Sequence, residues 1–321
     1  MENHEIKHPP ILAIVVPCYN EDLVIEETSR RLTGLLDELI SKTKLAPSSY
    51  IYFVDDGSQD NTWPLIVKFH EENSRIKGLK LSRNVGHQKA LLAGLLSIMD
   101  RVDCAISIDA DLQDDISIIE GFVDRFSEGY EIIYGVRKER KTDTFLKKYS
   151  ALFFYKIMRL MGVNIIYNHA DYRLASRRVL YHLSSFKEYN LFLRGIFPLL
   201  GFKSTTILYD RKERFAGHSK YPLRKMISFA WDGITSFSIT PLRFITLTGF
   251  VIFILSLLLS FWAFISFLNK EVIPGWASIV IPLYFLGGIQ LVSIGLIGEY
   301  LGKIYKEVKA RPHFLKDIEI F

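Results

Sequence analysis

The sequence predicts an α/β domain with a doubly wound, mostly parallel sheet, followed by an amphipathic interfacial helix and a two-helix transmembrane hairpin. Short apolar, β-branched runs alternate with helical patterns over the first half of the chain. Residues 241–300 then carry only four charged side chains, whereas 23% of the whole chain is charged. With 321 residues, the chain is long enough for a buried core and for about two structural units.

The alternating elements can be placed in order along the chain. The expected strands are Leu12–Pro17, Ile51–Val54, Gly78–Leu81, Ala105–Ile108 and Glu131–Tyr134. The expected helices between them are Leu23–Ile40, Trp63–Glu72, Gln88–Met99 and Ile116–Phe126. Strands and helices that alternate in this way form a sheet covered on both faces, and such folds bind ligands beyond the carboxyl ends of their strands.

Polar residues follow every one of these strands. They read Pro17-Cys18-Tyr19-Asn20-Glu21, Asp55-Asp56-Gly57-Ser58, Ser82-Arg83-Asn84-Val85-Gly86-His87, Asp109-Ala110-Asp111-Leu112-Gln113 and Gly135-Val136-Arg137. One such turn would be explained by helix capping, but five at equivalent positions indicate a ligand site. No G-x-G-x-x-G motif follows the first strand and no P-loop lysine is present, which disfavours a dinucleotide site and a P-loop phosphate site.

The pair Asp109 and Asp111 has a specific chemistry. Two carboxylates at the end of a buried strand repel each other unless a cation lies between them. Mg²⁺ commonly binds one or two carboxylates and completes its shell with substrate phosphates and water. Gln113 could add a carbonyl oxygen. The D-x-D pattern at this position therefore predicts a metal-bound nucleotide diphosphate.

The charge and cysteine patterns exclude other classes. The net charge of +5 is concentrated in residues 203–225 and 137–148, so the chain is not generally basic and no nucleic-acid partner is expected. Cys18 and Cys104 each lie in an apolar run, which predicts buried free thiols rather than a disulfide framework or a zinc site.

The apolar C-terminal region divides the chain into membrane and cytoplasmic parts. The uncharged stretches are long enough for spans at about 244–268 and 278–299, although a pair of buried core helices is the alternative. The polar start does not read as a signal peptide, and basic flanks place both termini and the large N-terminal domain in the cytoplasm. The expected parts are a cytoplasmic α/β domain at 1–221, an amphipathic juxtamembrane helix at 222–240, the hairpin at 241–301 and a cytoplasmic tail at 302–321. The amphipathic helix would lie on the membrane surface or, alternatively, pack on the soluble domain.

Six ordered motifs resemble a known family. VVPCYNE, FVDDGSQDNT, LSRNVGHQKAL, IDADLQDD, ADYRL and GHSKYPL resemble family 2 glycosyltransferases of the GT-A fold, and more narrowly the polyprenyl-phosphate group that includes dolichyl-phosphate mannose synthase and bacterial undecaprenyl-phosphate sugar transferases. The resemblance covers nearly the whole chain, because the bacterial members also carry a two-span hairpin. It implies Mg²⁺ or Mn²⁺ as cofactor and inverting transfer of one sugar to a polyprenyl phosphate at the bacterial inner membrane, from a UDP-sugar, with a GDP-sugar as the alternative. The Q-x-x-R-W motif of processive synthases is absent.

The resemblance also implies roles for single residues. The nucleotide-sugar would be bound by Pro17, Tyr19, Asn20, Glu21, Val54, Asp56, Lys89, Asp109, Ala110, Asp111 and Arg137, and the metal by Asp109, Asp111 and Gln113. The lipid phosphate would be bound by Lys147, Lys148, Ser150, Arg173, Arg214 and Lys220. Asp171, Arg214 and Lys220 would be the catalytic residues, and Ala170 stands where the family usually has glycine.

Several alternatives stay open at the level of sequence. A phosphate acceptor is already anionic near neutral pH, so Asp171 would orient the acceptor, Arg173 or the metal rather than abstract a proton; a buried Asp–Arg pair is the structural alternative. The chain could instead transfer a sugar to a lipid hydroxyl, or be a membrane scaffold with a decayed transferase domain. Contacts with membrane lipids are expected from the basic segments, and two spans leave homo-oligomerisation open.

Overall fold

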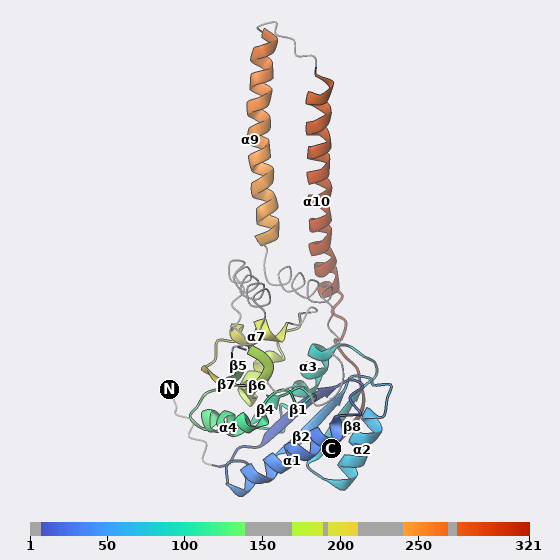
Figure 1. The fold of residues 1–321 in the computed structure, drawn as a ribbon, viewed down its shortest axis with the longest axis vertical. Helices are drawn as coiled ribbons and strands as arrows, with labels where there is room; N and C mark the ends of the chain where they lie inside the picture. Colours follow the sequence, from blue (N-terminus) through green and yellow to red (C-terminus); the bar gives the residue numbers. More distant parts are fainter. Residues whose placement is uncertain (1–7, 139–168, 189–191, 211–239, 269–274) are drawn as a thin grey trace. The chain divides into compact units, whose positions relative to one another are not determined.

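The computed structural model describes residues 8–138, 169–188, 192–210, 240–268 and 275–321 (Figure 1). The chain forms two compact units. One comprises Met1–Lys156, Asn164–Pro222 and Pro312–Phe321, and the other comprises Ile157–Val163 and Leu223–Arg311. The first unit therefore includes the C-terminal end of the chain, a segment for which the sequence indicated only a tail.

The first unit is built on an eight-stranded sheet with the order β7-β5-β6-β4-β1-β2-β3-β8. The strands are β1 Leu12–Cys18, β2 Tyr50–Asp55, β3 Ile76–Leu81, β4 Cys104–Ser107, β5 Ile132–Arg137, β6 His169–Ser176, β7 Ser204–Tyr209 and β8 Lys316–Ile320. The helices are α1 Ile25–Ser41, α2 Thr62–Glu72, α3 His87–Ile98, η1 Ile116–Ile118, α4 Ile119–Ser127, α6 Arg177–Leu183 and α7 Leu193–Leu199. Every strand and helix predicted between Leu12 and Tyr134 is present, with its ends shifted by a few residues.

The sheet is mixed, which corrects the prediction of a mostly parallel one. Strands β1, β2, β3 and β4 are parallel neighbours, as are β5 and β7. Strand β6 runs antiparallel to both β4 and β5, and β8 runs antiparallel to β3. The difference arises because β6 and β8 carry charged residues and so lack the apolar pattern from which the parallel strands were predicted.

Helices cover both faces of the central strands, which explains why β1 is buried along its whole length. Leu12, Ile14 and Val16 belong to the core that contains the apolar residues of α1, α2 and α4. Val15 lies on the other face against α3, where the two elements approach closely at Gly94. A Cβ atom at Gly94 would lie 2.6 Å from side-chain carbons of both Val15 and Val54, so only glycine allows this approach.

Strand β8 brings the C-terminus into the sheet at its β3 edge (Figure 1). Ile320 pairs with Gly78 and packs against the core. Phe321 lies against the rings of Tyr50 and Tyr52, with centroid distances of 5.3 Å and 6.0 Å. The strand thus covers hydrogen-bonding groups that β3 would otherwise expose.

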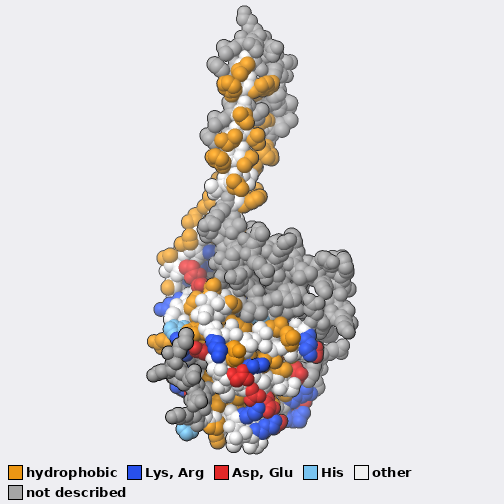
Figure 2. Space-filling view, turned by 90° about the vertical axis from the view of Figure 1, so that its left-hand side faces the viewer, with side chains coloured by type: hydrophobic (Ala, Val, Ile, Leu, Met, Phe, Trp, Pro, Cys, Tyr) orange, Lys and Arg blue, Asp and Glu red, His pale blue; other side chains and the backbone are white. Residues whose placement is uncertain are grey.

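The second unit contains two long helices, α9 at Thr240–Leu268 and α10 at Trp276–Val308. These helices coincide with the predicted spans at 244–268 and 278–299. Among the described residues, one segment, Phe285–Val308, is long and apolar enough to cross a membrane. Figure 2 shows hydrophobic side chains along the surface of this unit. Crossing by both helices stays a proposal, and the amphipathic segment at 222–239 lies outside the described residues.

Candidate active site

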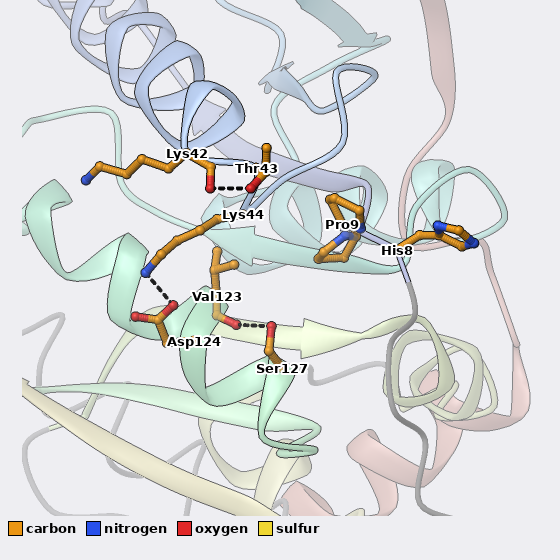
Figure 3. Close-up of a pocket in the computed structure, with 9 residues that line it drawn as sticks. His8, Pro9, Lys42, Thr43, Lys44, Val123, Asp124 and Ser127 are labelled. Atoms are coloured by element: carbon orange, nitrogen blue, oxygen red, sulfur yellow. Dashed lines mark hydrogen bonds and ion pairs between the residues drawn. The ribbon is translucent and has the colours of Figure 1, made fainter.

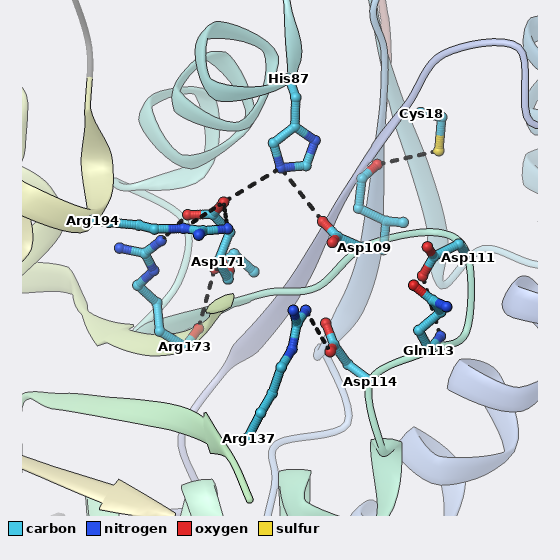
Figure 4. Close-up of polar contacts among 12 residues, drawn as sticks. Cys18, His87, Asp109, Asp111, Gln113, Asp114, Arg137, Asp171, Arg173 and Arg194 are labelled. Carbon is cyan, nitrogen blue, oxygen red and sulfur yellow. Dashed lines mark hydrogen bonds and ion pairs between the residues drawn. The ribbon is translucent and has the colours of Figure 1, made fainter. Parts of the chain in front are cut away.

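The predicted polar residues gather where β1, β2, β4 and β5 end, together with side chains from α3, β6 and α7 (Figure 4). Parallel strands present their carboxyl ends at one edge of the sheet, so residues far apart in the sequence meet there. Strand β6 lies between β4 and β5 and runs antiparallel to both. Asp171, near the beginning of β6, therefore lies at this same edge of the sheet. The gathered side chains form three connected groups.

The first group surrounds Asp56, which lies after β2 and is buried. Its carboxylate accepts hydrogen bonds from the backbone N–H of Val85 at 2.7 Å and of Gly86 at 2.9 Å. Burial raises the pKa of Asp56, and these two hydrogen bonds oppose the increase. Asp56 therefore holds the loop that leads into α3, a role that adds to the nucleotide contact expected from the sequence.

The second group is the D-x-D loop after β4. The Thr28 hydroxyl donates to the carbonyl of Ala110 at 2.8 Å, and the Gln113 N–H donates to Asp111 Oδ1 at 3.2 Å. Burial raises the pKa of Asp109; His87 opposes this, while the carboxylates around it, Asp114 first, raise the pKa further. The loop thus brings together carboxyl groups whose joint ionisation is unfavourable without a cation, at the position predicted for the metal.

Asp114 extends this group to β5 and β7. The Tyr209 hydroxyl donates to Asp114 Oδ1 at 2.5 Å, and Arg137 Nη2 donates to the same oxygen at 3.2 Å. Arg137 Nε also donates to the Tyr209 hydroxyl oxygen at 3.1 Å. Although burial disfavours the charged form of Arg137, Asp114 and Tyr209 outweigh it and raise the pKa of the guanidinium. The predicted phosphate-binding arginine is therefore fixed by two residues to which the sequence assigned no role.

The third group is centred on Asp171, which is 6% exposed. Arg173 Nη2 donates to its Oδ1, and Arg194 donates to its Oδ2 from Nη2 at 3.0 Å and from Nε at 3.3 Å. Burial alone would raise the pKa of Asp171, but Arg194, Arg173 and His87 together hold it well below its usual range. Asp171 is thus an ionised carboxylate with a guanidinium group on each oxygen.

Arg173 is more deeply buried than is expected for a residue that binds a lipid phosphate. Its side chain is 1% exposed, it donates to the Leu193 carbonyl at 3.3 Å, and its guanidinium lies 4.4 Å from the centre of the Phe197 ring. This position matches the buried Asp–Arg pair that was the structural alternative for the ADYRL motif. Arg194 was not identified from the sequence, because nothing in the short segment LRGIFPL distinguishes it from a surface arginine.

His87 connects the second and third groups. Its Nε2 lies 3.4 Å from Asp109 Oδ1 and 3.9 Å from Asp171 Oδ2 (Figure 4). The predicted metal ligand Asp109 and the predicted catalytic carboxylate Asp171 therefore lie on opposite sides of one imidazole.

The other residues predicted to bind the nucleotide-sugar lie at the same edge of the sheet. Pro17 and Val54 are buried, Tyr19 is 36% exposed, and Lys89 lies in the first turn of α3. The N–H groups of Asn20 and Glu21 donate to Ser58 Oγ at 3.0 Å and Thr62 Oγ1 at 2.9 Å, which ties the β1 loop to the β2 loop. The predicted residues Lys147, Lys148, Ser150, Arg214 and Lys220 lie outside the described residues.

Three further observations concern metal ligands, a surface hollow and the two cysteines. Among the residues that the structure describes, no three His, Cys, Asp or Glu side chains are arranged to hold a metal by themselves. A hollow of about 400 Å³, lined by residues that include His8, Lys42 and Lys44, lies where β1 begins and α1 ends (Figure 3). It contains none of the predicted site residues. Cys18 and Cys104 are buried free cysteines, as predicted.

Comparisons with known proteins agree with this arrangement. The family model "Glycosyl transferase family 2" matches residues 13–184. An uncharacterized glycosyltransferase of Bacillus subtilis, YkoT, is 57% identical over 312 residues, which cover 97% of this chain and 93% of the relative. A bactoprenol glucosyl transferase of Shigella phage SfX is 35% identical over 309 residues, which cover 95% of this chain and 98% of the relative.

A similarity to solved structures was also found. Glucosyl-3-phosphoglycerate synthase from Mycobacterium tuberculosis matches with a TM-score of 0.48 and 16% identity, over 71% of this chain and 78% of that chain. The family match spans the D-x-D loop, Asp56 and Asp171, and the relatives align over nearly the full length. The chain is therefore a glycosyltransferase of the GT-A fold and belongs to glycosyl transferase family 2.

Proposed function

We propose that this enzyme transfers one sugar from a nucleotide-sugar, a UDP-sugar by resemblance, to a polyprenyl phosphate such as undecaprenyl phosphate, with inversion at the anomeric carbon. The observation that carries the proposal is that an acidic D-x-D group and an arginine-rich group around Asp171 lie on either side of His87. Relatives named bactoprenol glucosyl transferase, which align over 95% of the chain, support the lipid phosphate as acceptor.

On the donor side, the residues present fit a divalent cation. Asp109 is an ionisable carboxylate in an environment that disfavours its charge, and Asp111 lies in the same loop. Oxygen ligands of this kind suit Mg²⁺ or Mn²⁺, with the donor diphosphate and water completing the shell. Asp109, Asp111 and Gln113 would hold the ion, which would supply positive charge to the diphosphate leaving group.

Arg137 would act on the same diphosphate. Asp114 and Tyr209 hold its guanidinium in one position, so little conformational freedom is lost when an anion binds. Preorganised positive charge stabilises a leaving group that becomes more anionic as its bond to the sugar breaks. Arg214 and Lys220 are proposed to add to this charge from a segment outside the described residues.

On the acceptor side, little activation is needed. A phosphate monoester has a second pKa near 6 and is mostly dianionic at neutral pH, so it can attack the anomeric carbon without a strong base. Asp171 is a poor base because two arginines bind its oxygens and lower its pKa. We therefore infer that Asp171 orients its neighbours. Lys147, Lys148 and Ser150 stay candidates for binding the lipid phosphate.

The membrane arrangement is also a proposal. We infer a cytoplasmic catalytic domain at 1–221, a juxtamembrane helix at 222–240 and two spans within 241–301, in the inner membrane of a bacterium. The lengths of α9 and α10 and the apolar segment Phe285–Val308 support it. Basic side chains at Lys303, Lys306 and Lys309 follow the proposed span at 278–299, as expected for its cytoplasmic end.

The test is nucleotide release by the purified full-length protein in detergent. A panel of UDP- and GDP-sugars is incubated with Mn²⁺ or Mg²⁺ and undecaprenyl phosphate, and the lipid product is identified by mass. We expect release from one donor that depends on both the metal and the lipid phosphate. Release that depends instead on diacylglycerol or ceramide would favour transfer to a lipid hydroxyl, and no release with any donor would favour a decayed transferase domain.

A further inference from the structure

Arg194 is placed by the main chain of its neighbour Leu193. The N–H of Leu193 donates to Gln88 Oε1 at 2.8 Å, and the Leu193 carbonyl accepts from Arg173 Nη1 at 3.3 Å. Leu193 is therefore tied to α3 on one side and to β6 on the other. Because Arg194 is the next residue, these two bonds fix the point from which its side chain extends.

The guanidinium of Arg194 is then directed at Asp171. Two of its nitrogens, Nη2 and Nε, donate to Asp171 Oδ2 at 3.0 Å and 3.3 Å. The Arg194 side chain is 38% exposed, whereas those of Asp171 and Arg173 are 6% and 1% exposed. Of these three charged side chains, Arg194 is the one that an incoming ligand can reach.

The charges of this group do not cancel. One carboxylate binds two guanidinium groups, so Asp171, Arg173 and Arg194 together carry one positive charge. The D-x-D loop beyond His87 contributes carboxyl groups, Asp109 and Asp111, and no cation. A phosphate placed among the carboxylates alone would be repelled, so an anionic acceptor needs a cation on its own side of the site.

We propose that Arg194 binds a phosphate oxygen of the acceptor, and that Asp171 is the positioning residue that holds the Arg194 guanidinium in place. This inference rests on the proposed function. The donor diphosphate offers the same oxygen chemistry, but Figure 4 places Arg194 at one end of the site, with His87 in the middle and Asp111 at the other end. That arrangement assigns Arg194 to the acceptor rather than to the diphosphate at the D-x-D loop.

The test separates the two substrates kinetically in the full-length protein. Initial rates are measured with undecaprenyl phosphate varied at saturating UDP-glucose, or at whichever donor the wild type uses, and then with the donor varied. UDP binding in the presence of Mn²⁺ is measured by calorimetry to report on the folded donor site. The variants are Arg194→Ala, Arg194→Lys and, as a matched control, Arg178→Ala, which removes an exposed arginine paired with Glu131.

We expect Arg194→Ala to raise KM for undecaprenyl phosphate by roughly 10- to 100-fold, while UDP binding and the donor KM stay unchanged. Arg194→Lys keeps the charge but loses the two-pronged contact with Asp171, so its increase should be smaller. Arg178→Ala should change neither constant. If Arg194→Ala misfolds and loses UDP binding, the acceptor KM of Arg194→Lys is used instead to test whether Arg194 binds the acceptor.

Three results would overturn the inference. An unchanged acceptor KM in a variant that binds UDP would show that Arg194 does not bind the acceptor. An equal rise in the donor KM would assign Arg194 to the diphosphate. If wild-type turnover did not depend on undecaprenyl phosphate at all, the proposed function would fail and this inference with it, whereas the first two results would leave that function intact.

Discussion

The hydroxyl of Tyr52 donates a 2.8 Å hydrogen bond to the carboxylate of Glu319, although 267 residues separate them in the chain. Tyr52 lies in β2 and Glu319 lies in β8. Arg101 reinforces the contact: its guanidinium lies 3.9 Å from the centre of the Phe321 ring and 3.8 Å from Glu319. The C-terminal strand is thus attached by side chains as well as by its ladder with β3.

Removing the hydroxyl of this tyrosine should loosen β8. Tyr52→Phe is expected to reduce the free energy of unfolding by about 1 kcal/mol, because Glu319 loses a partially buried donor. The midpoint of thermal unfolding in detergent measures the effect, with Tyr181→Phe, an exposed tyrosine, as control. Equal shifts in both variants would mean that the hydrogen bond between Tyr52 and Glu319 contributes nothing of its own.

Tyr209→Phe should weaken donor binding while the fold persists. Without the hydroxyl, Arg137 loses one acceptor and Asp114 loses a 2.5 Å donor, so the guanidinium is held by a single contact. We expect the affinity for UDP to fall by roughly 5- to 10-fold, which corresponds to about one hydrogen bond. Calorimetry with UDP and Mn²⁺ measures the change. Undiminished UDP affinity would show that Arg137 does not contact the diphosphate.

Ionised Asp171 should stabilise the folded protein, and this stabilisation should decrease at low pH. Its pKa is depressed in the folded state, so its contribution is fully present above the unfolded value of about 4 and is lost as the pH falls through the lower folded value. Asp171→Asn breaks a buried ion pair and should cost about 3–5 kcal/mol of unfolding free energy. Thermal unfolding should show a constant difference between pH 5 and 8, and Asp100→Asn serves as an exposed control. A difference that changes steeply within that range would contradict the assignment.

Divalent cations should stabilise the protein through the D-x-D loop. Mn²⁺ is expected to raise the midpoint of thermal unfolding at neutral pH, because it offsets the repulsion around Asp109. Asp109→Asn should abolish this increase, and it should make the metal-free protein no less stable. Asp100→Asn should keep the response to Mn²⁺. A cation response that survives in Asp109→Asn would place the ion elsewhere.

Two glycines in helices should respond oppositely to alanine. Gly94→Ala places a methyl group 2.6 Å from Val15 and Val54, and overpacking of this kind costs about 1–3 kcal/mol. Gly34 lies in α1 with no atom within 4 Å of the added carbon, so Gly34→Ala should stabilise the helix by up to about 1 kcal/mol. Chemical denaturation of the two variants compares them directly. Stabilisation by Gly94→Ala would mean that α3 can move away from the sheet at little cost.

The elements predicted from the sequence are those whose residue pattern shows directly whether they are buried or exposed. The first five strands are mostly apolar because they form the buried part of the sheet, and each is followed by the polar loop that the sheet then brings into the site. For the same reason the sequence predicts that Asp56, Asp109, Asp111 and Arg137 lie at one edge of the sheet, where the structure places them. Their backbone positions follow from the strand that precedes each of them.

The strands that were not predicted lack the apolar pattern of the first five. Strand β6 reads as polar because Asp171 and Arg173, two residues apart, neutralise each other inside the protein. Strand β8, Lys316–Ile320, alternates charged and apolar residues at an edge that the sequence gives no means of locating. Arg194 and Tyr209 acquire their roles only through partners 23 and 95 residues away, so no local pattern distinguishes them.

The pairing of β8 with β3 constrains how the chain can be threaded through a bilayer. Since these strands share one sheet, the C-terminus and the catalytic domain must lie in the same compartment. A chain that leaves a compartment and returns to it makes an even number of crossings. If Phe285–Val308 is one crossing, a second must lie between the end of β7 and Phe285, where α9 is the long helix that the structure describes. The main-chain ladder between β8 and β3 thus links the proposed crossing by α10 to the proposed crossing by α9.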